Sequence, residues 1–197
     1  MQQENPSPHP SHPNHHQGEI VNTLGFVDMV ITGTRTTTLD TVKDLTAEQL
    51  AWRAGPEANP VGFLLWHVFR TEDRYVRLLT SEQETHQADG WSDKWTLPST
   101  ITGDRASMTT GNSWTIEEVG IFNVPPLSEL LTYGEAVRKR TLAIVKGLDE
   151  SKLEEVPNAE RPDWTNASYL RSMITHEFGH QQQIDYIIGL CRVATAG

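Results

Sequence analysis

The chain has 197 residues and a formal net charge of −10 with histidine counted as neutral. This length suffices for one domain with a substantial core, and the acidic balance argues against nucleic acid and anionic membrane surfaces as partners, since both attract clustered Lys and Arg. Cys191 is the only cysteine, which excludes an intrachain disulfide and fits a reducing cytoplasm. Hydrophobic residues make up 37% of the chain, and no apolar run approaches the roughly 20 residues that a bilayer span needs.

Residues 1–17 are rich in Pro, His, Ser and Asn and cannot bury enough apolar surface to order themselves. We therefore predict a disordered tail here and a single domain over residues 18–197. The tail lacks the basic and apolar regions of a secretory signal. Its histidines can bind metal adventitiously, as His-rich tracts do; they are His9, His12, His15 and His16.

Apolar residues recur at helical spacing over residues 19–45, which predicts the first long helix. Thr46 and Gln49 resemble a capping box and predict a short helix after it. Asn59-Pro60 then introduces a second long helix over about 60–80.

Residues 81–126 contain three tryptophans, several glycines and Thr/Ser clusters. A structureless loop of this length is unusual in a compact domain, so we expect short turns or 3₁₀ pieces that form a lid or one wall of a pocket. Further helical patterns cover about 127–148 and about 166–193. Four long helices without comparable strand signals predict an all-α four-helix bundle with a long connection between the second and third helices.

His176 and His180 stand four residues apart on the apolar seam of the last helix. Residues at this spacing lie on one helical face, so the two imidazoles can share one metal ion. Buried imidazoles satisfied by neighbouring hydroxyls or carbonyls are the ordinary alternative. Two histidines on one helical face favour a metal, because the bundle interior would otherwise have to provide hydrogen-bond partners for four ring nitrogens.

A metal that remains open to ligands usually has three protein ligands. His67 lies on the core seam of the second long helix and is the candidate third ligand if this helix faces the last one. His86 lies in a polar run and is expected to be exposed. The sequence therefore predicts a metal site built from His67, His176 and His180.

The run from His176 to His180 also matches the H-E-x-x-H pattern of zinc proteases. The extended form of that motif needs Gly at the position of Gln183 and His at that of Tyr186, and neither is present. No glutamate follows Glu177, and the only downstream carboxylate, Asp185, is rotated off the face of His180. We therefore disfavour a metalloprotease.

Two stretches resemble the DinB-like family. They are Ala51–Arg53 followed by Asn59–Arg74, with Trp-His-x-x-Arg-x-Glu-Asp at its centre, and the closing His176–Ile184. The family includes DNA-damage-inducible proteins, mycothiol-dependent maleylpyruvate isomerases and related thiol S-transferases. The resemblance implies a four-helix bundle with a three-histidine metal site, which maps onto the same three histidines, and it allows a homodimer.

The resemblance favours a divalent metal, Zn²⁺ first and Ni²⁺ second, in a thiol S-transferase or isomerase that acts on a small electrophile with a low-molecular-weight thiol. A metal-dependent hydrolase that uses activated water is the second hypothesis. The third is a non-catalytic, stress-induced bundle with a structural metal. The small-molecule substrate itself cannot be named from the sequence.

Other polar residues near the triad have both ordinary and functional interpretations. Arg70, Glu72, Asp73 and Arg74 are most simply an exposed helix face with local ion pairs, with Arg70, one turn after His67, as the best candidate for a catalytic role. Glu177 is a candidate general base, although it lies about 100° round the helix from His176. Cys191 is expected to be a small core residue and not the reacting thiol.

Overall fold

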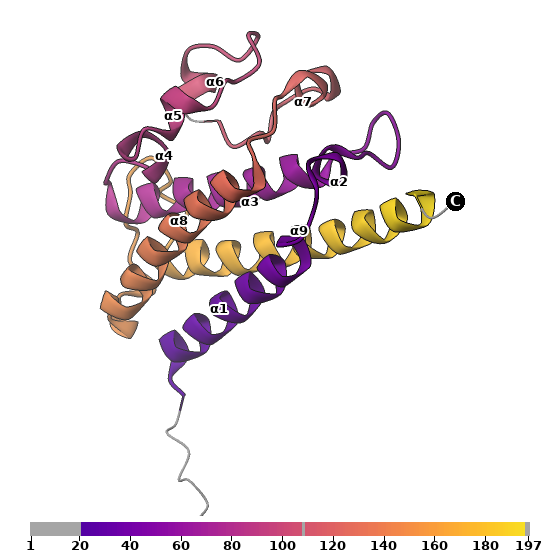
Figure 1. Cartoon of the computed structure of the whole chain (residues 1–197). Helices are drawn as coiled ribbons and strands as arrows, with labels where there is room; N and C mark the ends of the chain where they lie inside the picture. The colour runs from indigo at the N-terminus through magenta and orange to yellow at the C-terminus, as the bar shows by residue number, and fades with distance from the viewer. Residues whose placement is uncertain (1–20, 108, 196–197) are drawn as a thin grey trace, which may run out of the picture.

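The computed structural model describes residues 21–107 and 109–195, and within these ranges all its regular secondary-structure elements are helices. The predicted tail over residues 1–17 lies outside the described residues. Four long helices form the bundle (Figure 1): α1 (Thr23–Val42), α3 (Val61–Thr80), α8 (Leu127–Gly147) and α9 (Asn166–Thr195). The prediction of an all-α bundle with these four helices is confirmed. None of the described helices is both long and apolar enough to cross a bilayer.

Helix α3 lies at the centre of the bundle. It packs against α8 on one side and α9 on the other, and α1 contacts the same two helices. Every residue from Val61 to Asp73 is buried. The helix begins after Pro60, whose fixed φ suits a helix start, and it ends at Ser81, which adopts a left-handed conformation with φ 61°.

The close approach of α3 and α8 depends on a glycine. A Cβ added to Gly134 of α8 would lie 2.5 Å from a ring carbon of Phe69 on α3. No real Cβ contact is so short, so the two helices reach their spacing only with glycine here. Phe69 itself is completely buried in the larger core cluster with Trp66 and Leu130.

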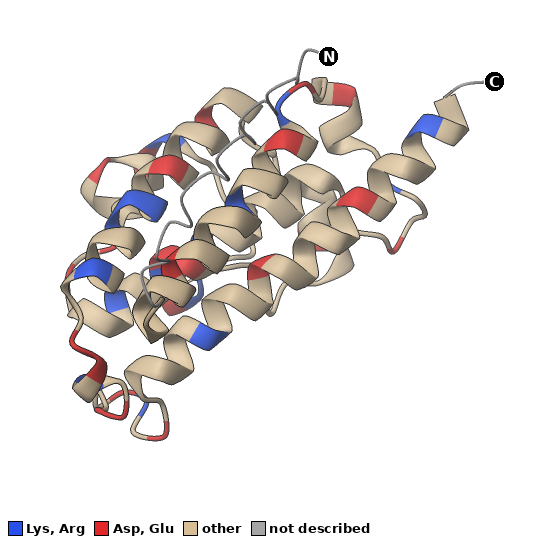
Figure 2. Ribbon diagram, turned by 90° about the horizontal axis from the view of Figure 1, so that it is seen from below, with Lys and Arg blue, Asp and Glu red and all other residues tan. Residues whose placement is uncertain are grey.

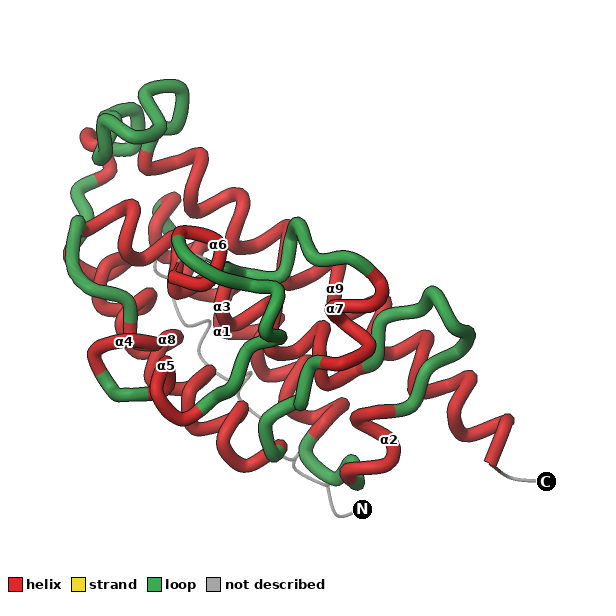
Figure 3. Tube along the Cα trace, turned by 90° about the horizontal axis from the view of Figure 1, so that it is seen from above, coloured by secondary structure: helices red, strands yellow, loops and turns green. Residues whose placement is uncertain are grey.

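Four short helices occupy the long connection: α4 (Thr85–Ala88), α5 (Trp91–Lys94), α6 (Asp104–Ser107) and α7 (Ile116–Ile121). They lie over α3 on the side away from α1, as Figure 3 shows from above. Trp95 and Phe122 are buried in the core cluster, and Trp91 and Trp114 pack against it. The tryptophans therefore hold the connection onto the bundle, and its short helices are α helices, where turns or 3₁₀ pieces were expected.

Shorter elements complete the chain. Helix α2 (Ala47–Ala51) starts with the predicted capping box of Thr46 and Gln49, and the 3₁₀ helix η1 (Glu150–Lys152) lies between α8 and α9.

Acidic and basic residues are interspersed over the helices seen from below (Figure 2).

The interpretation of Arg70, Glu72, Asp73 and Arg74 as an exposed helix face is wrong, and Arg74 is itself partly buried. Arg70 and Asp73 are completely buried, and Glu72 is 4% exposed. Glu72 is buried against Arg35 of α1 and Arg138 of α8. For Asp73 the reason is a long-range contact: it accepts the backbone N–H groups of Thr85 and His86, each at 2.9 Å, so α4 folds back over α3.

The expectation that His86 is exposed is wrong for the same reason. Its side chain is 3% exposed and packs against Trp95 and Tyr133. Burial, followed by the positive charge of Arg70, lowers the pKa of His86 to about 3. The imidazole is therefore neutral at neutral pH.

Candidate metal centre

Three histidines from two packed helices converge between α3 and α9. His67 projects from α3, and His176 and His180 project from successive turns of α9. Each offers one ring nitrogen, and these atoms lie within 4.8 Å of one another. The three-histidine arrangement predicted from the sequence is present and can hold a metal ion.

Hydrogen bonds fix the orientation of two of the imidazoles. His67 Nδ1 lies 2.5 Å from the carbonyl oxygen of Thr110, and His180 Nδ1 lies 2.8 Å from the amide oxygen of Gln183. Because these oxygens can only accept, both Nδ1 atoms carry the proton and each Nε2 keeps its lone pair. Outer partners of this kind orient metal-binding histidines.

Two of the three ligand nitrogens lie close to the spacing that a tetrahedral cation requires. Two nitrogens bound to one zinc at about 2.05 Å stand about 3.3 Å apart. His67 Nε2 and His176 Nε2 are 3.0 Å apart, so a small outward movement accommodates the ion. The donor set of three imidazoles, with two outer partners in place, therefore fits a divalent metal.

The electrostatics of the site favour neutral imidazoles, which metal binding requires. Burial, offset in part by the Thr110 carbonyl, lowers the pKa of His67 to about 4. Burial and the two neighbouring imidazoles lower the pKa of His176 to about 3. Burial also lowers the pKa of His180, although its bond to Gln183 acts in the opposite direction.

A cavity of about 320 Å³ opens onto the three histidines. The connection between α3 and α8 supplies one wall, as predicted, and α3 and α9 supply the other. Besides the histidines, the lining consists of Asn59, Phe63, Leu64, Gly111, Asn112, Trp114 and Val119. Apart from the histidines, none of these described lining residues is ionisable.

Gly111 allows the connection to approach α3 closely. Its φ of +91° is in the left-handed region, and a Cβ there would lie 2.8 Å from the ring of Phe63. Both the positive φ and the lack of space for a Cβ therefore require glycine at this position. This close approach places the neighbouring Thr110 carbonyl against His67 and Asn112 in the cavity wall.

Four buried charged residues, one from each long helix, form a group that we call the charge cluster: Arg35, Glu72, Arg138 and Glu177. Arg35 Nη2 and Arg138 Nη2 lie 2.6 Å and 2.9 Å from Glu72 Oε2. Arg35 Nε lies 2.7 Å from Glu177 Oε1, and Arg138 also pairs with Glu177. Burial alone would raise the pKa of Glu72, but the charges of Arg138 and Arg35 outweigh it, and the pKa is lowered.

Neither catalytic candidate from the sequence lines the cavity. Glu177 is 4% exposed and faces the charge cluster. Arg70 is fully buried, lies 2.7 Å from Glu84 and 3.2 Å from Asp73, and donates to the hydroxyl of Tyr133 at 3.0 Å. The structure thus brings the three histidines together and gives these two side chains other partners.

Sequence reasoning missed the charge cluster and the two asparagines of the cavity. The cluster has a signal in the sequence: Arg35 occupies the seam Ile31, Arg35, Thr38 and Val42, with spacings of four, three and four. Arginine at a core position of a helix indicates a buried ion pair. No local signal identifies Asn59 or Asn112.

The comparisons with known proteins agree with this geometry. Residues 31–184 match the sequence model of the DinB superfamily, and the chain belongs to that superfamily. It is similar to the crystal structure of a conserved protein from Enterococcus faecalis, with a TM-score of 0.73 and 20% identity over 87% of this chain and 98% of the other. At this identity the likeness concerns the fold. No functionally curated protein matches the sequence.

Proposed function

We propose that this protein is a metal-dependent thiol S-transferase or isomerase that joins a low-molecular-weight thiol to a small electrophile. The observation that carries the proposal is a three-histidine centre that opens into a cavity. Zn²⁺ is the first candidate metal and Ni²⁺ the second, because imidazole ligands suit both.

When bound, a divalent cation supplies Lewis-acid chemistry that lowers the pKa of a coordinated thiol or water. The chain's own residues do the rest. The Thr110 carbonyl holds His67 in its tautomer, and Phe63 and Trp114 supply apolar surface in the cavity wall beside the histidines. Asn59 and Asn112 offer amide donors and acceptors that orient a polar substrate.

The proposed reaction needs no general base from the chain. The thiol releases its proton to solvent, its sulfur forms a bond to the electrophilic carbon, and a leaving group departs with its electron pair. In an isomerisation the thiol itself is expelled again. Cys191 is not the reacting thiol, because it is buried in the core.

The cavity lining favours this reaction over the two alternatives. A hydrolase that activates water benefits from a carboxylate base, and none of the described lining residues is acidic. A structural metal is normally enclosed by four protein ligands, whereas His176 and His180 are only partly buried and face a cavity.

The test is thiol consumption with a model electrophile, measured on the zinc- and nickel-loaded protein with a panel of low-molecular-weight thiols. We expect metal-dependent turnover that His67→Ala abolishes and Asn112→Ala weakens, chiefly through KM. Cys191→Ala is the matched control and should retain turnover. Ester or amide hydrolysis without added thiol would instead establish the hydrolase. A metal that raises Tm without turnover in either assay would establish a structural role.

A further inference from the structure

A second cavity lies on another side of the bundle, between α1 and α8. It measures about 630 Å³ and is here called the α1–α8 groove. Its described lining consists of Arg35, Leu39, Lys43, Leu131, Glu135, Arg138, Lys139, Leu142, Ala143 and Lys146. It shares no residue with the cavity of the metal centre. Its volume is in the range of small-molecule sites.

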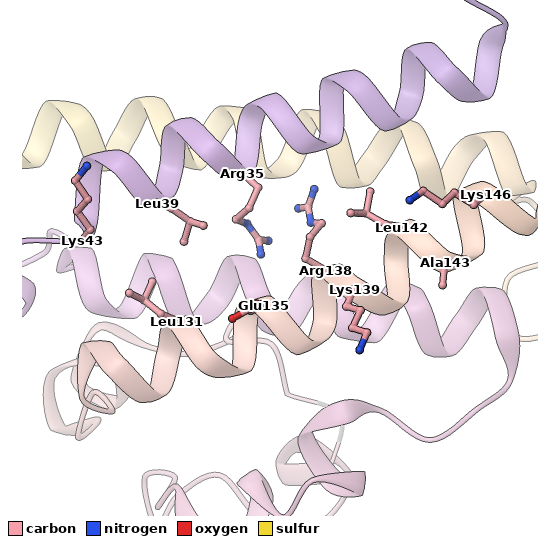
Figure 4. Close-up of a pocket in the computed structure, with 10 residues that line it drawn as sticks. All are labelled: Arg35, Leu39, Lys43, Leu131, Glu135, Arg138, Lys139, Leu142, Ala143 and Lys146. Atoms are coloured by element: carbon pink, nitrogen blue, oxygen red, sulfur yellow. The ribbon is translucent and has the colours of Figure 1, made fainter.

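The floor of the groove is apolar despite its two arginines. The guanidinium groups of Arg35 and Arg138 bind Glu72 and Glu177 in the interior, so their side chains are only 6% and 9% exposed. Their charges are thereby compensated, and what they offer the groove is chiefly alkyl stem. Leucines and Ala143 lie along both halves of the groove, on either side of these arginines (Figure 4).

The rim of the groove is basic, although the chain as a whole is acidic. Three lysines and one glutamate line it, in a protein whose net charge is −10. Lys43 and Lys146 stand at opposite ends, with Lys139 between them (Figure 4). Lys43 pairs with Asp40 at 3.0 Å, whereas Lys139 and Lys146 form no ion pair with any residue that the structure describes. Two lysines are therefore available to an anion.

The groove is elongated. Leu131 and Lys146 mark its extent along α8, which at 1.5 Å per residue is about 22 Å. A groove of this length, with an apolar floor and the unpaired Lys146 at one end, matches an extended alkyl chain with one anionic head group.

We propose that the α1–α8 groove binds a long-chain carboxylate. The head group lies at Lys146, whose ammonium points toward Leu142 (Figure 4), and the alkyl chain runs over Leu142 toward Leu39 and Leu131. The site is independent of the metal centre and of the reaction proposed there.

The test is calorimetric titration of the full chain with decanoate below its micellar concentration, with decanol and acetate as comparisons. Decanoate should bind with one-to-one stoichiometry, decanol more weakly because it lacks the charge, and acetate not measurably because it lacks the chain. Exchanging both lysines (Lys139→Glu with Lys146→Glu) should weaken binding at least about tenfold, the effect of losing one charge-assisted contact. Lys152→Glu, an exposed lysine outside the groove, is the matched control and should bind normally.

A second variant tests the location. Ala143 is exposed, so Ala143→Trp fills the groove without disturbing the core, which an unchanged Tm verifies. It should abolish decanoate binding. Absence of decanoate binding to the parent protein, or equal binding by the parent and both groove variants, would overturn the proposal. So would a dimer in light scattering that Ala143→Trp converts to monomer, since the groove would then be an interface between two copies.

Discussion

Replacing Glu177 by Gln should destabilise the protein without removing a catalytic group. The substitution keeps the shape of the side chain but removes one of the two negative charges that compensate Arg35 and Arg138. Glu72 remains as the only acidic partner of both arginines within the charge cluster. One positive charge is then left uncompensated in a region where all four side chains are at least nine-tenths buried.

The size of the effect follows from this burial. Removing one partner of a buried ion pair typically costs about 3–5 kcal/mol. Because the glutamine amide oxygen can still accept one hydrogen bond, the lower end applies, and we expect about 3 kcal/mol. For a chain of this size each kcal/mol changes Tm by about 2–4 °C, so Tm should fall by roughly 6–12 °C.

Calorimetric melting and urea unfolding measure the loss directly. Glu154→Gln is the matched control, because Glu154 is exposed and its replacement should change stability by no more than about 0.5 kcal/mol. Metal stoichiometry should be unchanged at a temperature where the variant is folded. An unchanged Tm together with a large loss of kcat would refute this reasoning and make Glu177 a catalytic base.

Two further predictions concern packing and pH. Gly134→Ala should lower the free energy of unfolding in urea by about 1–3 kcal/mol, because its Cβ would meet Phe69 at 2.5 Å. The control Gly189→Ala, where a Cβ meets nothing within 4 Å, should be neutral or stabilising. Equal effects of the two substitutions would show that α3 and α8 can move apart without loss of stability. The pKa of His86 is about 3 in the folded state, below the value of about 6.5 in the unfolded state. Between these two pH values the unfolded state therefore binds more protons than the folded state. His86 consequently destabilises the fold progressively as pH falls from 6.5 toward 3. His86→Phe should therefore gain about 2.5 kcal/mol relative to the parent between pH 7.5 and pH 4.5. A pH-independent difference in urea unfolding would show that the imidazole has the same pKa in the folded and unfolded states and would contradict this reasoning.

The helices and the histidine triad could be predicted because their signals are local. His176 and His180 share a face through the helical repeat, and His67 lies on the apolar seam of its own helix. Once α3 and α9 pack together, these seams must meet. The resemblance to the DinB-like family indicates the same three residues, and membership of that superfamily is now shown.

The polar residues of the core could not be placed in the same way. The burial of Asp73 and His86 depends on the docking of α4, a contact between segments that no periodic pattern links. The charge cluster needs all four long helices at once, so no single helix reveals its partners. Its two arginines nevertheless occupy core positions in their helices, and this pattern indicates a buried ion pair.

The connection between α3 and α8 carries one local sequence signal for a helix start. Thr115 and Glu118 form a capping box at the start of α7, with the reciprocal bonds at 3.2 Å and 2.8 Å. The spacing is visible in the sequence and predicts a helix start. What it cannot predict is that this helix brings Val119 to the wall of the metal cavity.

The most direct test of the metal centre is elemental analysis of the purified, untagged chain after loading with zinc or nickel. The account predicts one more equivalent of metal in the parent protein than in a variant with all three triad histidines replaced by alanine. His86→Ala, which changes a buried histidine outside the triad, should keep that equivalent. Equal metal content in the parent and the triad variant would contradict the account and leave the three histidines as polar residues of the core.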